Sequence, residues 1–415
     1  MGTRVETLIV GAGQAGLTLS HHLTAHGRPH LLLDRGRVGE RWRSERWDSF
    51  KLLTPNWQTG LPGLDYRGDD PDGFMDRAEV VDLFERYARS FDAPVHTGVA
   101  VHRIRPAGGA WCVISDHGSF IADNVVVATG HHALPRIPME PAVRLPADIV
   151  QLHTSHYRNP QQLPDGGVLV VGAGPSGQQI AEELALAGRR VVLAAGRHRT
   201  LPRRYRGRDA HWWMHRMSAF DRTIDSLADP QAVRSTPAFV LAGGRHDMDL
   251  RRLVARGVTP TGRLAGVQGA TVWFGDDLAA TVAAADRHRQ EFRNSVDDFV
   301  ARSDVPAAAP DDEPPPPGAG VRQAPRRLQL DDAGIHSVLW ATGYRRDFSW
   351  IDADVFDATG EPLQRRGVTT ADGLFFLGLR WMYRRGSDTI HGVGADAEHL
   401  AGVIARRTVA AAVRA

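Results

Sequence analysis

The chain has 415 residues, of which 42% are hydrophobic, and its formal net charge is only +2. This length and composition exclude a fibrous or wholly disordered protein and predict a soluble chain of two packed domains. Charges of both signs are interspersed, so neither a nucleic-acid nor a membrane partner is expected. The one cysteine, Cys112, excludes a disulfide framework, a zinc cluster and a redox-active cysteine pair within the chain, and no metal site is expected.

The N-terminus runs directly into an apolar strand at residues 7–10, without the basic stretch and long apolar run of a signal peptide. We therefore expect a cytoplasmic location. Lys51 is the only lysine, so nearly all of the positive charge is arginine. This argues against Schiff-base and Walker-type chemistry and makes the placement of individual arginines informative.

The first chemical motif is GAGQAG at residues 11–16, between the strand at residues 7–10 and a helical stretch that reaches His26. The first glycine permits a tight turn, the second lets the backbone approach a pyrophosphate, and the third allows close packing of the helix. A second apolar strand, residues 30–33, ends in an acid that can accept hydrogen bonds from a ribose hydroxyl. This order predicts an FAD site with the binding residues Gly11, Gly13, Gly16 and Asp34.

The same arrangement recurs at residues 168–195, where GAGPSG follows an apolar strand and opens a second helix. No acid ends the next strand, and the chain continues instead with Arg197 and Arg199. An arginine holds a 2′-phosphate bidentately whereas a carboxylate repels it, so this second site favours NADPH over NADH. Arg203 and Arg204 are further candidates of the same kind. The expected binding residues of the motif itself are Gly172, Gly174, Pro175, Ser176 and Gly177.

Two apolar strands close on Ala-Thr-Gly, at residues 125–130 and 337–343, and these turns mark matching crossover points. From them, Thr129 and Gly343 join the cofactor-binding candidates. The expected fold class is α/β with two Rossmann-like dinucleotide-binding domains, the NADPH domain being inserted into the FAD domain. The expected limits are 1–150 and 325–415 for the FAD domain and 151–324 for the NADPH domain.

The second domain is predicted to end in a helix at about residues 278–302, which has apolar and charged residues at helical spacing and folds back on that domain. A proline-rich linker follows at residues 305–325, because four consecutive prolines at 314–317 cannot continue a helix. Two dinucleotide sites in one chain indicate that a hydride passes from nicotinamide to flavin. The electron acceptors left open are molecular oxygen, a small-molecule substrate or another redox protein.

Residues 40–63, ERWRSERWDSFKLLTPNWQTGLPG, and residues 151–160, QLHTSHYRNP, resemble the flavin-containing monooxygenases, particularly a bacterial branch of that family. The similarity continues through ATGYRRDFSWI at 341–351, GLFFLGL at 373–379 and GVGADAEHLA at 392–401, so it spans nearly the whole chain. The resemblance implies an FAD- and NADPH-dependent monooxygenase. In this family the reduced flavin and O2 form a C4a-hydroperoxide that oxygenates a small-molecule nucleophile, here expected to react at nitrogen or sulfur.

The resemblance also assigns individual residues. His153 and Tyr157 match half of the family fingerprint, Phe-x-Gly-x-x-x-His with a following aromatic residue, whereas Ala147 and Ile149 replace its Phe and Gly. A tyrosine at the aromatic position is more typical of N- or S-oxygenation than of the Baeyer–Villiger type. Asn56 falls where the family places a catalytic asparagine beside the flavin ring. The residues expected to pack on the FAD are Arg41, Trp42 and Trp47.

The last motif looks like a glycine turn that opens the final helix, whose N–H groups would face the flavin pyrimidine edge and stabilise negative charge on the reduced ring. His391, just before the turn, is expected to donate a hydrogen bond to flavin or substrate as a catalytic residue. The aromatic segment at residues 205–220 is expected either to cover part of a substrate channel or to pack the domains together. The cofactor-binding candidates of the turn are Gly392, Gly394 and Asp396.

Two other functions stay open at this point. An NAD(P)H oxidase or electron-transfer reductase would carry the same motifs without oxygenating a substrate. A redox-state sensor would bind both nucleotides and turn over too slowly to be an enzyme. Substrate identity and oligomeric state lie outside what these motifs encode, because specificity depends on a pocket assembled from distant loops.

Overall fold

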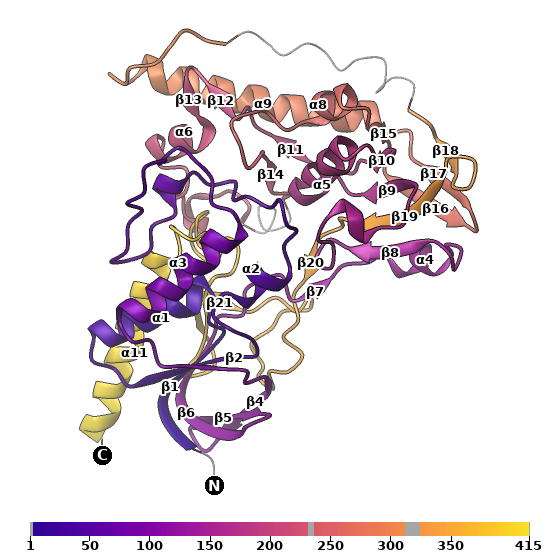
Figure 1. Ribbon diagram of the computed structural model, residues 1–415. Helices are drawn as coiled ribbons and strands as arrows, with labels where there is room; N and C mark the ends of the chain where they lie inside the picture. Colours follow the sequence, from indigo (N-terminus) through magenta and orange to yellow (C-terminus); the bar gives the residue numbers. More distant parts are fainter. Residues whose placement is uncertain (1–2, 231–235, 312–323, 415) are drawn as a thin grey trace.

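Two sheets organise the fold, and each of them carries one glycine motif (Figure 1). This computed structural model describes residues 3–230, 236–311 and 324–414, with side chains described as far as Arg407. Among these residues, the first sheet has the order β21-β22-β23-β6-β1-β2-β3, and the antiparallel strands β4 and β5 extend it from β6. The strand bounds are β1 (Thr3–Val10), β2 (His30–Asp34), β3 (Val95–Thr97), β4 (Val101–Ala107), β5 (Ala110–Ser115), β6 (Gly118–Val127), β21 (Gln364–Arg365), β22 (Val368–Thr369) and β23 (Leu374–Phe376).

The second sheet is parallel throughout its described strands, in the order β15-β10-β9-β19-β8. Its central strand β9 is buried at every position. Such a continuous apolar run is typical of a parallel sheet that is covered on both faces. The bounds are β8 (Val150–His153), β9 (Gly167–Val171), β10 (Val191–Ala194), β15 (Thr259–Thr261) and β19 (Ile335–Trp340).

The chain enters the second sheet after β6 and returns to the first before β21, so the second unit is inserted into the first, as predicted. One strand departs from the expected limits. β19 follows residue 324, yet it lies in the second sheet between β8 and β9. It is needed there because β9 pairs with β10 along one edge only, and β19 provides the parallel partner along the other edge.

The two crossings between the sheets lie side by side. β7 (Leu134–Pro135) follows β6, β20 (Tyr344–Arg345) follows β19, and the two pair antiparallel in the middle of the molecule (Figure 1). The Arg136 N–H also donates to the carbonyl oxygen of Gly343 at 2.9 Å. The connection is therefore a hydrogen-bonded ribbon of two strands rather than two independent linkers.

Helices pack beside both sheets. Figure 1 shows α1, α3 and α11 together beside the first sheet and α9 along the second unit near α8. The predicted final helix of the second unit is confirmed as α9, and the buried positions along it include Leu278, Val282, Ala285 and Val296. The helix bounds are α1 (Gln14–Ala25), α2 (Glu40–Ser44), α3 (Arg77–Ser90), α4 (Met139–Val143), α5 (Pro175–Leu186), α6 (Ala210–Arg216), α8 (Leu250–Ala255), α9 (Leu278–Ala301) and α11 (Gly394–Arg414).

Smaller elements complete the second unit. A parallel pair joins β11 to β14, an antiparallel hairpin joins β12 to β13, and β16, β17 and β18 form an antiparallel sheet. The four consecutive prolines of the predicted linker lie outside the described residues. No helix within the described ranges is long and apolar enough to cross a membrane. The bounds are β11 (Arg199–Thr200), β12 (Arg204–Tyr205), β13 (Arg208–Asp209), β14 (Phe239–Val240), β16 (Leu264–Gln268), β17 (Thr271–Phe274), β18 (Arg327–Gln329), η1 (Asn56–Gln58), η2 (Pro160–Gln162) and η3 (Ile224–Ser226).

Candidate cofactor and active site

The first glycine loop, residues 11–16, joins β1 to α1 and provides a different environment at each glycine. Gly11 has a φ of +110°, and a Cβ atom there would lie 2.7 Å from the carbonyl oxygen of Ala128. A Cβ atom at Gly16 would overlap the carbonyl oxygen of Gly11, so only glycine lets the helix pack against the turn. A Cβ atom at Gly13 would meet nothing within 4 Å, and no side chain caps α1 there. The N-terminus of α1 is therefore open at Gly13, as a pyrophosphate site requires.

Asp34 ends β2 beside this loop. Its Oδ2 accepts a hydrogen bond from the N–H of Ala12 at 2.7 Å, and its Oδ1 accepts one from the N–H of Gly36 at 2.9 Å. Each carboxylate oxygen keeps a lone pair for a ribose hydroxyl. The carboxylate that the sequence proposes as a ribose acceptor thus also fixes the glycine loop.

The second glycine loop, residues 172–177, repeats this geometry between β9 and α5. Gly172 has a φ of +113°, and a Cβ atom there would overlap the carbonyl oxygen of Ala341. A Cβ atom at Gly177 would overlap Gly172, whereas one at Gly174 would meet nothing within 4 Å. The two loops therefore offer the same open helix N-terminus to a ligand. The predicted Pro175, Ser176 and Gly177 form the first turn of α5.

Each Ala-Thr-Gly turn lies against the first glycine of one loop, as the matching motifs indicate. The carbonyl of Gly343 already accepts hydrogen bonds from Arg136 N–H and His153 Nε2, both at 2.9 Å. Thr129 is half-buried in the corresponding turn beside the first loop. The alanine N–H groups donate to the last residue of the adjacent strand, Ala128 to Val10 at 2.9 Å and Ala341 to Val171 at 2.8 Å.

The two arginines that follow β10 have different surroundings. Arg197 is exposed and has no hydrogen-bond or ion-pair partner within the described part of the chain. Arg199 is half-buried, and its guanidinium carbon lies 4.1 Å from the ring centroid of Phe239. Burial lowers the pKa of Arg199 below its usual range, and the charge of Arg380 adds to this effect. Arg197 is therefore the freer of the two to meet a phosphate.

The further candidate Arg203 is excluded as a phosphate ligand by its position. Its side chain has 0% exposure, and its Nε donates to the carboxylate of Asp209 at 2.8 Å. Its Nη2 lies 2.7 Å from the same carboxylate oxygen as an ion pair. It also donates to the carbonyl oxygen of Leu53 at 2.8 Å. A run of arginines in the sequence does not reveal which of them has an internal acid. Arg204 stays exposed and donates to the carbonyl of Gly207 at 2.6 Å.

Three candidates lie on or just after α2, next to the first loop. The Arg41 guanidinium donates to the carbonyl oxygen of His132, and burial lowers the pKa of Arg41. Trp42 is half-buried. Trp47 is only 4% exposed and packs edge-on against Phe50, with 5.1 Å between the ring centroids. Of the three, Trp47 is a core residue and has the least surface left for a cofactor.

Asn56 is buried in η1 and has one unpaired atom. Its Nδ2 donates to the carbonyl oxygen of Asp70 at 2.9 Å, and Tyr66 Oη lies 3.4 Å from the same nitrogen. Its Oδ1 is buried without a hydrogen-bond partner among the described residues. A buried acceptor without a partner costs about 1–3 kcal/mol, so this oxygen marks a place where a ligand donor would fit.

Gln58, two residues further on, joins the buried His211 to the half-buried His391, which lies far away in the sequence. Its Oε1 lies 2.9 Å from Nδ1 of His211, and its Nε2 lies 3.1 Å from Nε2 of His391. Because an amide oxygen accepts and an amide nitrogen donates, His211 carries its proton on Nδ1 and His391 accepts at Nε2. A neutral His391 then has its proton on Nδ1, which is buried without a partner in the described structure. One N–H donor is thus available to a ligand.

Burial keeps both of these histidines neutral near pH 7. It lowers the pKa of His391 to about 4, with a smaller contribution from the charge of His215. It also holds the pKa of His211 well below its usual range, and the neighbouring Arg203 adds to this effect. The free N–H of His391 is therefore a neutral donor, not a cation.

His153 and Tyr157, the matching half of the family fingerprint, have structural partners. Nδ1 of His153 lies 3.0 Å from Oγ of Ser155, and its Nε2 bonds to Gly343. The Tyr157 hydroxyl donates to Glu183 at 2.8 Å, and burial raises the pKa of both Tyr157 and Glu183. His153 thus joins the end of β8 to the turn before β20, and Tyr157 joins the segment after β8 to α5.

The final helix, α11, begins at Gly394, where the sequence predicts it. A Cβ atom at Gly394 would lie 3.1 Å from Cγ of Pro62, and one at Gly392 would overlap Gly386. Asp396, in the first turn, has 0% exposure, and this burial raises the pKa of its carboxyl group. The turn is thus closely packed, and the acid of the motif lies inside it.

The segment at residues 378–391 brings these parts together. The Gln14 side-chain amide in the first turn of α1 donates to the carbonyl oxygen of Asp388 at 3.3 Å. His131, which follows the first Ala-Thr-Gly turn, lies 3.8 Å from the Asp388 carboxylate. The first loop, η1 and the start of α11 therefore meet through this segment. The sequence does not single out Gln58, His131 or His211. Gln58 and His131 have a local signal in their place beside motifs, whereas His211 has none.

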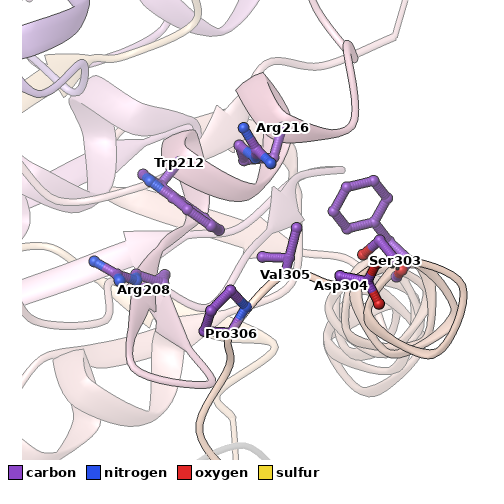
Figure 2. Close-up of a pocket in the computed structure, with 8 residues that line it drawn as sticks. Arg208, Trp212, Arg216, Ser303, Asp304, Val305 and Pro306 are labelled. Atoms are coloured by element: carbon purple, nitrogen blue, oxygen red, sulfur yellow. Dashed lines mark hydrogen bonds between the residues drawn. The ribbon is translucent and has the colours of Figure 1, made fainter.

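A surface pocket of about 480 Å³ lies away from these residues, between α6 and the end of α9 (Figure 2). Figure 2 shows Trp212 and Arg216 from α6 facing Ser303, Asp304 and Val305. The aromatic segment at residues 205–220 therefore contributes both to this pocket and to the core. Trp212 lines this surface pocket, whereas Trp213 and Met214 are core residues with 0% and 3% exposure.

Comparison with known protein families and curated proteins gives a consistent picture. Residues 8–213 match the pyridine nucleotide-disulphide oxidoreductase family. The protein named "Uncharacterized oxidoreductase CzcO-like" from Geobacillus kaustophilus is 33% identical over 401 residues, which cover 95% of this chain and 97% of the relative. The "Indole-3-pyruvate monooxygenase YUCCA1" of Oryza sativa subsp. japonica is 34% identical over 185 residues, 44% of this chain and 45% of that protein.

Solved structures agree with the fold. A flavin-containing monooxygenase from Stenotrophomonas maltophilia superposes with a TM-score of 0.67 at 18% identity, covering 98% of this chain and 99% of that one. This likeness extends over both sheets, so two dinucleotide-binding units in one chain are confirmed as the architecture.

Proposed function

We propose that this chain, which belongs to the CzcO-like oxidoreductases, is an FAD- and NADPH-dependent monooxygenase. Its substrate in this proposal is a small organic nucleophile that is oxygenated at nitrogen or sulfur. Flavin supplies the hydride acceptor and the oxygen chemistry when bound, and the nicotinamide supplies the hydride. The protein's part is to position these groups and to exclude water.

The observation that carries the proposal is the pair of glycine loops with one geometry. Both helices, α1 and α5, begin uncapped at a glycine where a Cβ atom would meet nothing within 4 Å. The first loop has an acid, Asp34, at the end of its second strand, which suits the unphosphorylated ribose of FAD. The second loop has Arg197 in that region, which suits the 2′-phosphate of NADPH.

The candidate active site lies where η1 meets the start of α11. His391 offers a neutral N–H and Asn56 offers an unpaired oxygen, so the site presents one donor and one acceptor. Gln58 keeps the donor on Nδ1 by occupying Nε2 of His391. The network is buried, so these hydrogen bonds are stronger than they would be in water.

The proposal predicts a transient species during reoxidation. We expect the holoenzyme, reduced anaerobically by NADPH and then mixed rapidly with oxygenated buffer, to pass through an absorbance band that belongs to neither oxidised nor reduced flavin. Amines and thioethers should shorten the lifetime of this band. Direct reoxidation with stoichiometric hydrogen peroxide would contradict the proposal and support an oxidase or electron-transfer reductase.

A second prediction concerns the choice of nicotinamide cofactor. We expect Arg197→Ala to raise the KM for NADPH by about 10- to 100-fold, since a charge-assisted hydrogen bond contributes about 1.5–3 kcal/mol. The KM for NADH should change little, because NADH has no 2′-phosphate. Steady-state kinetics with both cofactors measures the effect, and Arg256→Ala, at an exposed residue just beyond α8, is the control. Equal changes for the two cofactors would rule out a phosphate contact at Arg197.

A further inference from the structure

Two arginines from distant parts of the chain share one aromatic ring. The guanidinium carbon of Arg199, in β11, lies 4.1 Å from the ring centroid of Phe239, and that of Arg385 lies 5.1 Å from the same centroid. Arg199 belongs to the second unit, whereas Arg385 lies in the segment that precedes α11. Two positive charges therefore converge where the two units meet.

Neither guanidinium has an acidic partner among the described residues. Arg385 donates a side-chain hydrogen bond to the thioether sulfur of Met214 at 3.7 Å. Nε of Arg199 is buried without a partner in the part of the chain that the structure describes. Burial lowers the pKa of Arg385 to about 10, and the next contributions come from the positive charges of Arg199, Arg380 and Arg222.

Arg199 and Arg385 are half-buried, and two fully buried arginines of this chain are neutralised internally. Arg203 is paired with Asp209, and Arg289 is paired with Asp247. A buried cation without a counter-ion is strongly unfavourable, because the desolvation of the charge is not repaid by an ion pair. The carboxylate of Glu291 raises the pKa of Arg199, but it makes no ion pair with Arg199 among the described residues. Glu291 is exposed, and its carboxylate lies 3.2 Å from Nδ1 of His288 instead. The Arg199 and Arg385 pair thus lacks a counter-ion that a ligand would supply.

The pair lies one aromatic ring from the candidate active site. Phe220 packs edge-on against His391, with 4.8 Å between ring centroids, and its centroid is 5.8 Å from the guanidinium carbon of Arg385. The same ring stacks on His211 at 5.6 Å. An anion held by Arg385 would therefore keep the rest of its molecule close to the free N–H of His391.

We propose that Arg199 and Arg385 bind the carboxylate of the organic substrate, with Phe220 and Phe239 in contact with its apolar part. The proposal rests on the proposed function and adds the substrate class, an apolar or aromatic carboxylic acid that also carries the reacting atom. A carboxylate fits because a planar guanidinium donates two parallel hydrogen bonds to it. The phosphates of the two dinucleotides have their own sites at the open ends of α1 and α5.

The test compares benzoate with benzamide, which has nearly the same shape and no charge. Each is titrated into the oxidised holoenzyme while flavin absorbance and thermal stability are recorded. We expect benzoate to bind at least about 10-fold more tightly than benzamide, which corresponds to about 1.4 kcal/mol. In Arg385→Met this preference should disappear, while Arg385→Lys keeps part of it. The control Arg256→Met, at an exposed residue beyond α8, should keep all of it.

Two further measurements on Arg385→Met, its Tm and its KM for NADPH, separate a ligand site from a structural role. The Tm of ligand-free Arg385→Met should be equal to or higher than that of the wild type, because the substitution removes a half-buried charge that has no acidic partner among the described residues. The KM for NADPH should stay unchanged. If Arg385→Met does not fold, Arg385→Gln takes its place with the same expectations.

Three results would overturn the proposal. The first is equal binding of benzoate and benzamide, and the second is a benzoate preference that survives in Arg385→Met. The third is competition of benzoate with NADPH together with a raised KM for NADPH in Arg385→Met. The last would assign the arginines to a cofactor phosphate. Binding needs no turnover, so an Arg385-dependent benzoate site in an enzyme without a transient reoxidation band would refute only the monooxygenase function.

Discussion

Replacing Gly13 with alanine is expected to leave the fold intact and to weaken FAD binding by about 100-fold, or about 2.8 kcal/mol. Alanine can adopt the backbone conformation of Gly13, which has a φ of −88° and a ψ of −170°, and its Cβ atom would meet no protein atom within 4 Å. The methyl group would instead occupy the space where a pyrophosphate approaches the N-terminus of α1. Bound flavin per chain and the far-ultraviolet circular dichroism spectrum measure the two effects.

Matched substitutions make this experiment sharper. Gly174→Ala changes the equivalent position of the second loop, where φ is −72° and the space is equally open. It should leave flavin content normal and slow flavin reduction by NADPH. Gly16→Ala should destabilise the fold itself, because its Cβ atom would overlap the carbonyl of Gly11. If Gly13→Ala retains its flavin with wild-type affinity, the first loop is not the pyrophosphate site.

Acid is expected to destabilise this protein through its buried histidines, and His391 should contribute about 2 kcal/mol at pH 5. Burial lowers the pKa of His391 to about 4 from an ordinary value of 6.5. Below pH 6.5 the unfolded chain binds a proton at this position and the folded chain does not. The stabilisation is therefore complete above pH 6.5 and is lost as the pH falls towards 4.

Urea unfolding at pH 7 and pH 5 measures this difference. His391→Gln keeps a polar side chain of similar reach but cannot titrate. Between pH 7 and pH 5 this variant should therefore lose about 2 kcal/mol less of its unfolding free energy than the wild type does. His26→Gln, at an exposed residue, is the control and should behave as the wild type. Burial also lowers the pKa of His131, His132 and His211, so part of the acid sensitivity remains in the variant. Identical pH dependence in wild type and His391→Gln would show that His391 is not held neutral.

The sequence predicts well whatever depends on neighbouring residues. The two glycine loops, the acid at Asp34 and the start of α11 at Gly394 are local patterns, because each follows from the order of strand, turn and helix. The same reasoning misplaced β19, whose sheet is decided by the unpaired edge of β9. Strand partners across more than a hundred residues are not encoded in any one motif.

The candidate site shows the same division. The family resemblance predicts Asn56 as a site residue, whereas its neighbour Gln58 acquires a role only because His211 and His391 lie on either side of its amide. Arg203 looked equivalent to Arg197 in the sequence, and the difference between them is the buried carboxylate of Asp209. Charge compensation inside a fold depends on which side chains meet in space, and a single sequence does not state that.

The insertion of one sheet within the other has a consequence for how the chain is made. β6 cannot acquire its neighbour β23 until Leu374–Phe376 has left the ribosome, and α11 follows later still. The second sheet, by contrast, has all of its described strands once Trp340 has emerged. During synthesis the inserted unit can therefore close first, while the N-terminal strands wait with an open edge.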